Sequence, residues 1–384
     1  MGRGDFLRSH LRGEAPPKHD GRNVDPRLGK LEGEGALQEV EHLGAEHPYP
    51  ALPDRNESTY DGASYYGLPV LKEHVWKAAI PAYFYVGGLA GASAVLGAAA
   101  QWSQNPFLRG LVERTRIIAA GGAVLSGALL IEDLGRPSRF LNMLRVFRPT
   151  SPMSVGSWVL AAFGGFATIA AVLRKQRFGP LATVGDVAAL GAGVLGLPLA
   201  GYTAVLLANT AVPVWQGPAA SLPPLFMASA VTSAASALEL CELNPFEARV
   251  VRRFGLAGKA AELFFSKAVE RAASQPEIVG APLRRGLSGA LWKSAEVLVA
   301  ASLLASALSV RSRPLRRASG WLGTLGTIAL RFGILQAGRM SARDPHATFA
   351  RQRGTTTPRA TDRVRVDATR PSIAQADAGP TSLR

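Results

Sequence analysis

A succession of long, charge-free apolar stretches occupies the middle of the chain. The first runs from Ile80 to Gln101, and the second centres on Ile117 to Ile131. A helix needs about 20 mostly apolar residues to cross a hydrocarbon core of roughly 30 Å. Because lipid offers the backbone no hydrogen bonds, only helices and closed barrels span it. The sequence therefore predicts an all-α fold, a polytopic integral membrane helical bundle.

Seven spans are clear from the apolar pattern. They cover residues 80–101, 117–131, 153–173, 187–208, 220–240, 289–310 and 319–338. Gly87 and Gly91 form a GxxxG pattern in the first span, which is typical of closely packed membrane helices. Trp215 falls in the turn between the fourth and fifth spans, and we expect it to lie at the membrane interface.

Residues 246–273 form a further helix whose position the pattern leaves open. Their apolar spacing is helical, but charges occur throughout. Such a helix can lie in the interface. If it crosses instead, the basic loop at 311–317 falls on the same side as the basic loops after the first and third spans, as the positive-inside rule favours. The basic stretch 136–148 lies on the opposite side and weakens this argument. We expect eight helices.

The charged residues gather outside the spans. Residues 1–70 and 341–384 are polar and are predicted to be disordered tails around a transmembrane domain at 71–340. The formal net charge is +15, and the arginines lie beside apolar stretches. We therefore assign them to lipid headgroups and topology rather than to nucleic acid. The pattern predicts a multi-pass protein of the cell membrane, the bacterial inner membrane.

The chain lacks the residues that hold electron-carrying cofactors in many membrane proteins. None of its six histidines lies in a predicted span, so we expect no haem. Its single cysteine, Cys241, excludes an iron–sulfur cluster within this chain. Metal-binding spacings such as HExxH and CxxC are absent from the sequence. Redox chemistry would therefore need a diffusible lipid carrier and a separate partner.

Several ionisable residues fall at or near membrane depth. The second span has about 15 uncharged residues, which give a helix of roughly 22 Å. Glu132 and Asp133 at its end are therefore expected within the outer layer of the membrane. Glu239, Glu296 and Arg331 lie in or at the ends of later spans. Ionisable groups in a membrane are costly, tend to pair, and often mark paths for protons, ions or substrates.

Three segments resemble a known family. They are YYGLPVLKEHVWKAAIPAYFYVGGLAGAS at 65–93, DLGRPSRFLNMLRVFRPTSPMSVGSW at 133–158, and GTLGTIALRFGILQAGRMSARDP at 323–345. Together they are similar to the polysulfide reductase NrfD-type membrane subunit family, over about residues 60 to 345.

The resemblance implies a haem-free subunit that is not catalytic alone. Such a subunit anchors a ferredoxin-like iron–sulfur subunit, which serves a molybdopterin or tungstopterin catalytic subunit of the formate dehydrogenase or polysulfide reductase type. It exchanges electrons with a quinone, either menaquinone or ubiquinone, as its exchangeable substrate.

The resemblance also implies site residues. Asp133 and Arg136 match the DLGRP motif, and Glu132 stands where many relatives have histidine. His74 stands where many relatives have proline, so it is either a quinone partner or an interfacial residue. The expected catalytic residues are Glu132, Asp133 and Arg136, and the expected quinone-binding residues are His74, Trp76, Tyr83 and Asn142.

The chemistry of a quinone site needs donors for two carbonyl oxygens, a proton relay and an apolar slot for the tail. Tyr83, Trp76 and His74 offer donors, and Asp133 with Glu132 offers the relay. An alternative role for Asp133 is to pair with Arg136 and shape the turn after the second span. Two other functions stay open: a passive membrane anchor, and a proton or ion translocator. The translocator would use Glu132, Asp133, Glu239, Glu296 and Arg331.

Overall fold

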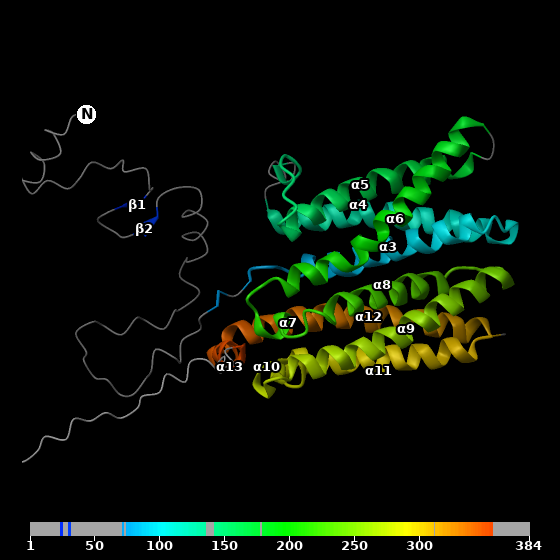
Figure 1. Cartoon of the computed structure of the whole chain (residues 1–384). Coiled ribbons are helices and arrows are strands. Elements are labelled where there is room, and N and C mark those ends of the chain that lie inside the picture. Colours follow the sequence, from blue (N-terminus) through cyan, green and yellow to red (C-terminus); the bar gives the residue numbers. More distant parts are fainter. Residues whose placement is uncertain are drawn as a thin grey trace, which may run out of the picture. The chain divides into compact units, whose positions relative to one another are not determined.

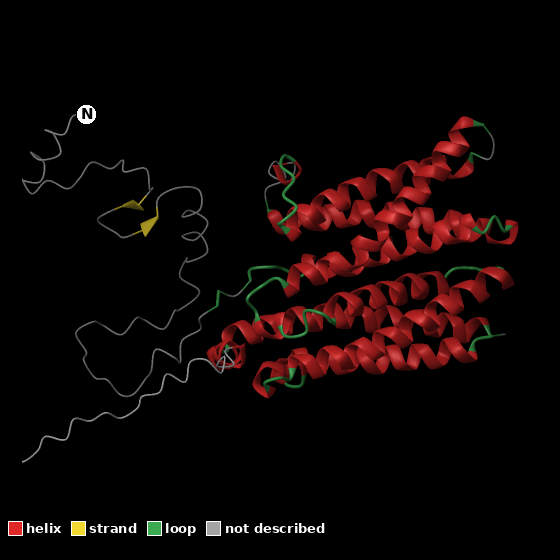
Figure 2. Cartoon of the chain, in the orientation of Figure 1, coloured by secondary structure: helices red, strands yellow, loops and turns green. Residues whose placement is uncertain are grey.

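The computed structural model describes residues 71–72, 74–135, 142–176, 179–310 and 312–355, together with two short strands nearer the N-terminus. The chain divides into two compact units, Met1–Ser64 and Tyr65–Arg384. In the first unit, β1 (Val24–Asp25) pairs antiparallel with β2 (Lys30–Leu31). The described part of the second unit contains helices and turns (Figure 2).

The described part of the second unit contains eight long helices, which confirms the predicted all-α membrane bundle. They are α3 (Ala79–Trp102), α4 (Arg109–Leu134), α5 (Pro152–Val172), α6 (Pro180–Ala208), α8 (Leu222–Glu239), α9 (Pro245–Ala273), α11 (Gly286–Leu308) and α12 (Arg313–Arg343). The short elements are η2 (Pro106–Leu108), η4 (Leu173–Lys175), α7 (Pro213–Gln216), α10 (Glu277–Gly280), η5 (Ala281–Leu283) and α13 (Pro345–Thr355). Helix α13 lies in the segment for which the sequence predicts a polar tail.

The long helices pack as two groups of four. Helices α3, α4, α5 and α6 form one group, and α8, α9, α11 and α12 form the other (Figure 1). Helices α3 and α6 contact α8, and α3 also contacts α12, so these helices join the two groups. Consecutive long helices run in opposite directions (Figure 1).

Local sequence signals explain where several helices begin. Asn244 and Glu247 form a capping box at the start of α9, with Pro245 in the first turn. The Ser151 side chain caps α5 by accepting from the Ser154 backbone N–H. The Ser312 side chain caps α12 in the same way.

Small residues let α3 and α6 approach closely. A Cβ atom on Gly91 would lie 2.6 Å from the carbonyl oxygen of Gly196, so neither helix backbone could keep its place with a side chain there. Gly87 instead packs beneath the Tyr83 ring. The GxxxG prediction is confirmed, because Gly91 allows backbone contact between helices.

Helix α9 takes the position that the sequence left open. It runs along α8 and α11 as a member of the second group (Figure 1). As a result, the turns after α3, α5 and α11 lie at one end of the bundle, as the charge argument expected. Among the residues that the structure describes, five long helices are apolar enough to cross a membrane: α3, α4, α5, α6 and α11. Helices α8, α9 and α12 fall short because they carry polar and charged side chains.

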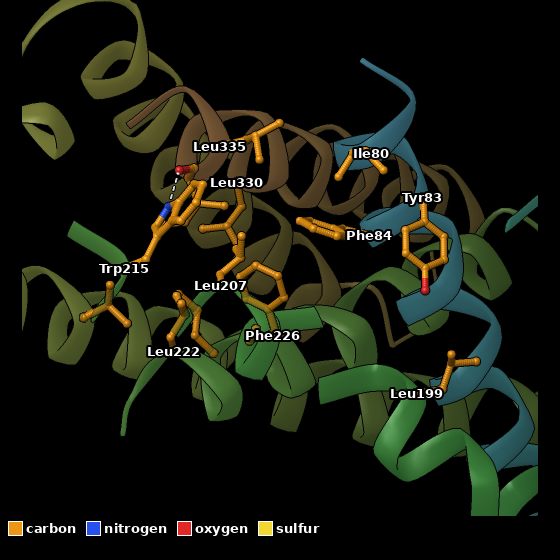
Figure 3. Packing of buried hydrophobic residues seen from close by; sticks show 14 of the residues in the cluster. Ile80, Tyr83, Phe84, Leu199, Leu207, Trp215, Leu222, Phe226, Leu330 and Leu335 are labelled. Atoms are coloured by element: carbon orange, nitrogen blue, oxygen red, sulfur yellow. Dashed lines mark hydrogen bonds between the residues drawn. The ribbon is translucent and has the colours of Figure 1, made fainter. Parts of the chain in front are cut away.

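The core corrects one expectation. Trp215 is only 1% exposed and packs among apolar side chains of α6, α8 and α12 (Figure 3). It is therefore an internal residue rather than an interfacial anchor. Its indole N–H donates to the carbonyl oxygen of Ile334 at 2.8 Å, which satisfies the one polar group of the ring.

Candidate functional site

Three aromatic rings meet at the end of the bundle where α3 begins. The His74 ring lies 5.0 Å from the Trp76 ring and 5.1 Å from the Trp215 ring, measured between centroids. Trp76 and Trp215 stack at 6.1 Å with an angle of 17°. His74 and Trp76, both predicted quinone-binding residues, are thus brought together. Trp215 could not be added to this group from the sequence, because it is about 140 residues away along the chain.

The segment before α3 is fixed from two sides. The Arg339 guanidinium of α12 donates to the Trp76 carbonyl oxygen. On the other side, the Lys77 backbone N–H donates to Oδ1 of Asp133 at 3.1 Å. Asp133 therefore connects the end of α4 to the start of α3.

The other predicted residues of this region differ in their surroundings. Glu132 is exposed at the last turn of α4, and Asn142 is exposed in the turn that precedes α5. Helix α4 ends at Gly135, which has φ of 69°, a left-handed conformation that favours glycine. Arg136 lies outside the described residues, so its predicted pairing with Asp133 stays a prediction.

Tyr83 lies deeper, on the side of α3 that faces α4. It is 3% exposed, and its hydroxyl has no hydrogen-bond partner among the described residues. Its ring points along α3 toward Gly87, and the Ser126 hydroxyl of α4 lies beside the same glycine. The Ser126 hydroxyl is fully buried and also lacks a described partner. A buried hydroxyl without a partner costs free energy, so this pair is suited to a polar ligand atom.

A cavity of about 240 Å³ lies between α4 and α5. Its wall includes Leu130, one turn before Asp133, and Met143 and Leu144, which directly follow Asn142. The wall is almost entirely apolar. None of the predicted quinone-binding residues lines it, although it begins beside Asp133 and Asn142 in sequence.

A second polar cluster lies inside the other group of helices. The Lys259 ammonium of α9 donates to both carboxylate oxygens of Glu239 at 2.9 Å and to the Ser319 hydroxyl at 2.8 Å. The Ser306 hydroxyl donates to Glu239 at 2.8 Å. Glu239 is thus buried and paired, as its predicted membrane depth requires.

Arg331 and Glu262 form the deeper part of this polar region. Arg331 is 1% exposed, donates to the carbonyl oxygen of Phe226 at 3.0 Å, and lies 3.8 Å above the Phe226 ring centroid. Glu262 is also 1% exposed, and its carboxylate interacts with the Thr232 and Ser229 hydroxyls and with the charge of Arg331. Lys259 and Glu262 were missed in the sequence because their helix was too charged to be a clear span. Their spacing of three residues, on one face of a helix, was the available signal.

Glu296 differs from these buried groups. It accepts from Lys267 at 2.8 Å, and the Lys267 side chain is 54% exposed. Glu296 therefore belongs to a surface ion pair between α9 and α11. The predicted intramembrane charges and Asp133 lie in different groups of helices and do not form one site.

Comparison with known proteins identifies the first part of the bundle. The sequence model described as polysulphide reductase, NrfD, matches residues 70–253, from the segment before α3 to the first turns of α9. No curated protein matches the chain. The third resembling segment, at 323–345, lies outside the matched range. Over residues 70–253 this chain is therefore similar to the NrfD family, whose members are membrane subunits of molybdopterin oxidoreductase complexes.

Proposed function

We propose that this chain transfers electrons between a membrane quinone and a ferredoxin-like iron–sulfur partner, as the haem-free membrane subunit of a molybdopterin-type or tungstopterin-type oxidoreductase in a bacterial inner membrane. NrfD-family subunits associate with iron–sulfur and molybdopterin catalytic subunits. The substrate of the complex, of the formate dehydrogenase or polysulfide reductase type, would be set by the catalytic partner.

The buried pair of hydroxyls at Tyr83 and Ser126 carries the proposal. Both groups can donate a hydrogen bond, and neither has a described acceptor. A quinone supplies two carbonyl oxygens that accept such bonds, and it takes up two protons with two electrons on reduction. The site lies in the first group of helices, within the matched family segment.

Proton exchange with water would use the end of α4. Asp133 accepts the Lys77 N–H through Oδ1, and Oδ2 takes no part in that contact. Glu132 beside it is exposed. The two carboxyls thus supply acceptors between the outside and the buried end of the site.

The test compares Tyr83→Phe with the unmodified protein in the purified membrane complex. Quinol-linked turnover should fall about ten-fold or more, because the quinone carbonyl oxygen loses the hydrogen bond from the Tyr83 hydroxyl. The unfolding temperature should not fall, because the removed hydroxyl makes no hydrogen bond to the described chain. Unchanged turnover in Tyr83→Phe would exclude this site and would favour a passive anchor.

Proton translocation is a second candidate function, and the buried charges of the second group favour it. Glu239, Lys259, Glu262 and Arg331 lie together within α8, α9 and α12 at exposures of 0–1%. Glu262 is the strongest candidate to take up a proton because it is buried and, unlike Glu239, forms no ion pair with a described lysine or arginine. A pH change across proteoliposomes driven by quinol, and abolished by Glu262→Gln, would support it. Equal pH changes in both proteins would contradict it.

A further inference from the structure

The cavity between α4 and α5 is an elongated slot. On α4 its wall extends from Ala123 to Leu130, and on α5 it extends from Ser157 to Thr168. At 1.5 Å per residue these stretches are about 10 and 16 Å long. The cavity has a volume of about 240 Å³. Its elongated wall suits a flexible chain.

The chemistry of the wall selects an apolar occupant. The polar side chains on the wall are Ser157 and Thr168, and the remaining residues are aliphatic, glycine or methionine. The Ser157 hydroxyl is already used, because it donates to the Ser154 carbonyl oxygen at 2.9 Å. A headgroup with carbonyl oxygens would gain little here, whereas a hydrocarbon chain would bury its surface.

Two glycines create the slot. A Cβ atom on Gly127 would meet nothing within 4 Å, and a Cβ atom on Gly164 would only touch Ala123 at 3.7 Å. The slot is open on one side, because its wall residue Val124 is 69% exposed.

Several wall residues of the slot lie close, along the chain, to residues of the proposed quinone site. Its upper end, at Leu130, is one turn from Asp133, and Met143 directly follows Asn142. On the neighbouring face of α4, Ser126 precedes the slot residue Gly127. An occupant that lies in the slot and ends near Asp133 therefore reaches the region where we place the quinone ring.

We propose that the α4–α5 slot binds the isoprenoid tail of the quinone. This inference rests on the proposed function, because it requires the ring to bind beside Asp133 and Tyr83. It adds a specificity element: the slot lets the chain distinguish long-tailed membrane quinones from ring analogues without a tail.

The experiment measures quinone binding to the full chain in lipid nanodiscs by quenching of tryptophan fluorescence. Two probes share one naphthoquinone ring, and only one of them carries an isoprenoid tail. Gly127→Leu and Gly164→Leu fill the slot with a side chain. Gly121→Leu on α4 and Gly165→Leu on α5 are matched controls, because both positions are open and neither lines the slot.

The slot-filling variants should weaken binding of the tailed probe about ten-fold or more, a loss of about 1.4 kcal/mol. Binding of the tail-free probe should not change, and both control variants should behave like the unmodified protein. If all variants bind the tailed probe equally, the slot proposal is wrong while the quinone function stands. Displacement of a co-purified phospholipid by the slot variants, without a change in quinone affinity, would assign the slot to a lipid acyl chain and overturn the proposal. If the unmodified protein binds neither probe, the proposed function fails as well.

Discussion

The Lys259 ammonium contacts both carboxylate oxygens of Glu239 at 2.9 Å, and the two side chains are 0% and 1% exposed. Removing one partner of such a pair leaves an uncompensated buried charge, which costs about 3–5 kcal/mol. We therefore expect Lys259→Met to lower the free energy of unfolding by this amount. Denaturation of the detergent-solubilised protein, followed by circular dichroism, measures the loss.

A second ion pair serves as the control. Lys267 lies on the same helix and pairs with Glu296, but its side chain is 54% exposed. Lys267→Met should cost about 1 kcal/mol or less. The double variant Glu239→Gln/Lys259→Met should recover most of the stability lost in Lys259→Met. If Lys259→Met and Lys267→Met lose equal free energies of unfolding, burial does not make the Glu239–Lys259 pair more important for stability.

Trp215→Phe should destabilise the protein by about 1–3 kcal/mol, because the buried carbonyl of Ile334 loses its donor. The matched control is Trp321→Phe on α12, where the side chain is 60% exposed. This control should change the unfolding temperature little. A similar shift in both variants would show that Trp215 does not hold α7 to α12 through its indole.

Gly91→Leu should separate α3 from α6, because the new side chain would occupy the place of the Gly196 carbonyl. Overpacking of this kind typically costs about 1–3 kcal/mol, and more where backbone must move. Gly121→Leu, on the open side of α4, should be tolerated. Thermal unfolding of the two variants gives the comparison, and a fully stable Gly91→Leu protein would refute the close helix contact.

Asp133 allows its structural and chemical roles to be separated. Asp133→Asn keeps an oxygen that can accept the Lys77 N–H, so stability should be preserved. Asp133→Leu removes this acceptor and should cost about 0.5–1.5 kcal/mol. If Asp133 relays protons, both variants should lose quinol-linked turnover. Normal turnover in Asp133→Asn would show that Asp133 does not relay protons and only accepts the Lys77 N–H.

The sequence predicted most of the bundle because its strongest signal, the length of apolar stretches, is local. Charge-free spans correspond to α3, α5 and α11 to within a few residues. The position of helix α9 was harder to predict. Lys259 and Glu262 are charged, which indicates a solvent-exposed helix, and their partners on α8 and α12 are known only from the structure. Trp215 was misplaced for the same reason: its contacts with His74 and Ile334 connect segments far apart in the chain. The cavity between α4 and α5 had no sequence signal, since glycines in membrane helices usually indicate tight packing.

The Glu239–Lys259 pair has a consequence for how the protein enters the bilayer. Helix α9 is too polar to partition into lipid alone, because a lone charged side chain at the centre of an inserting helix is penalised. Its lysine finds its counter-ion on the preceding helix, and the turn between them is short. We therefore expect α8 and α9 to leave the insertion machinery together as a hairpin. In the second half of this protein, insertion is then cooperative, because a charged helix enters the bilayer only together with the helix that carries its counter-ion.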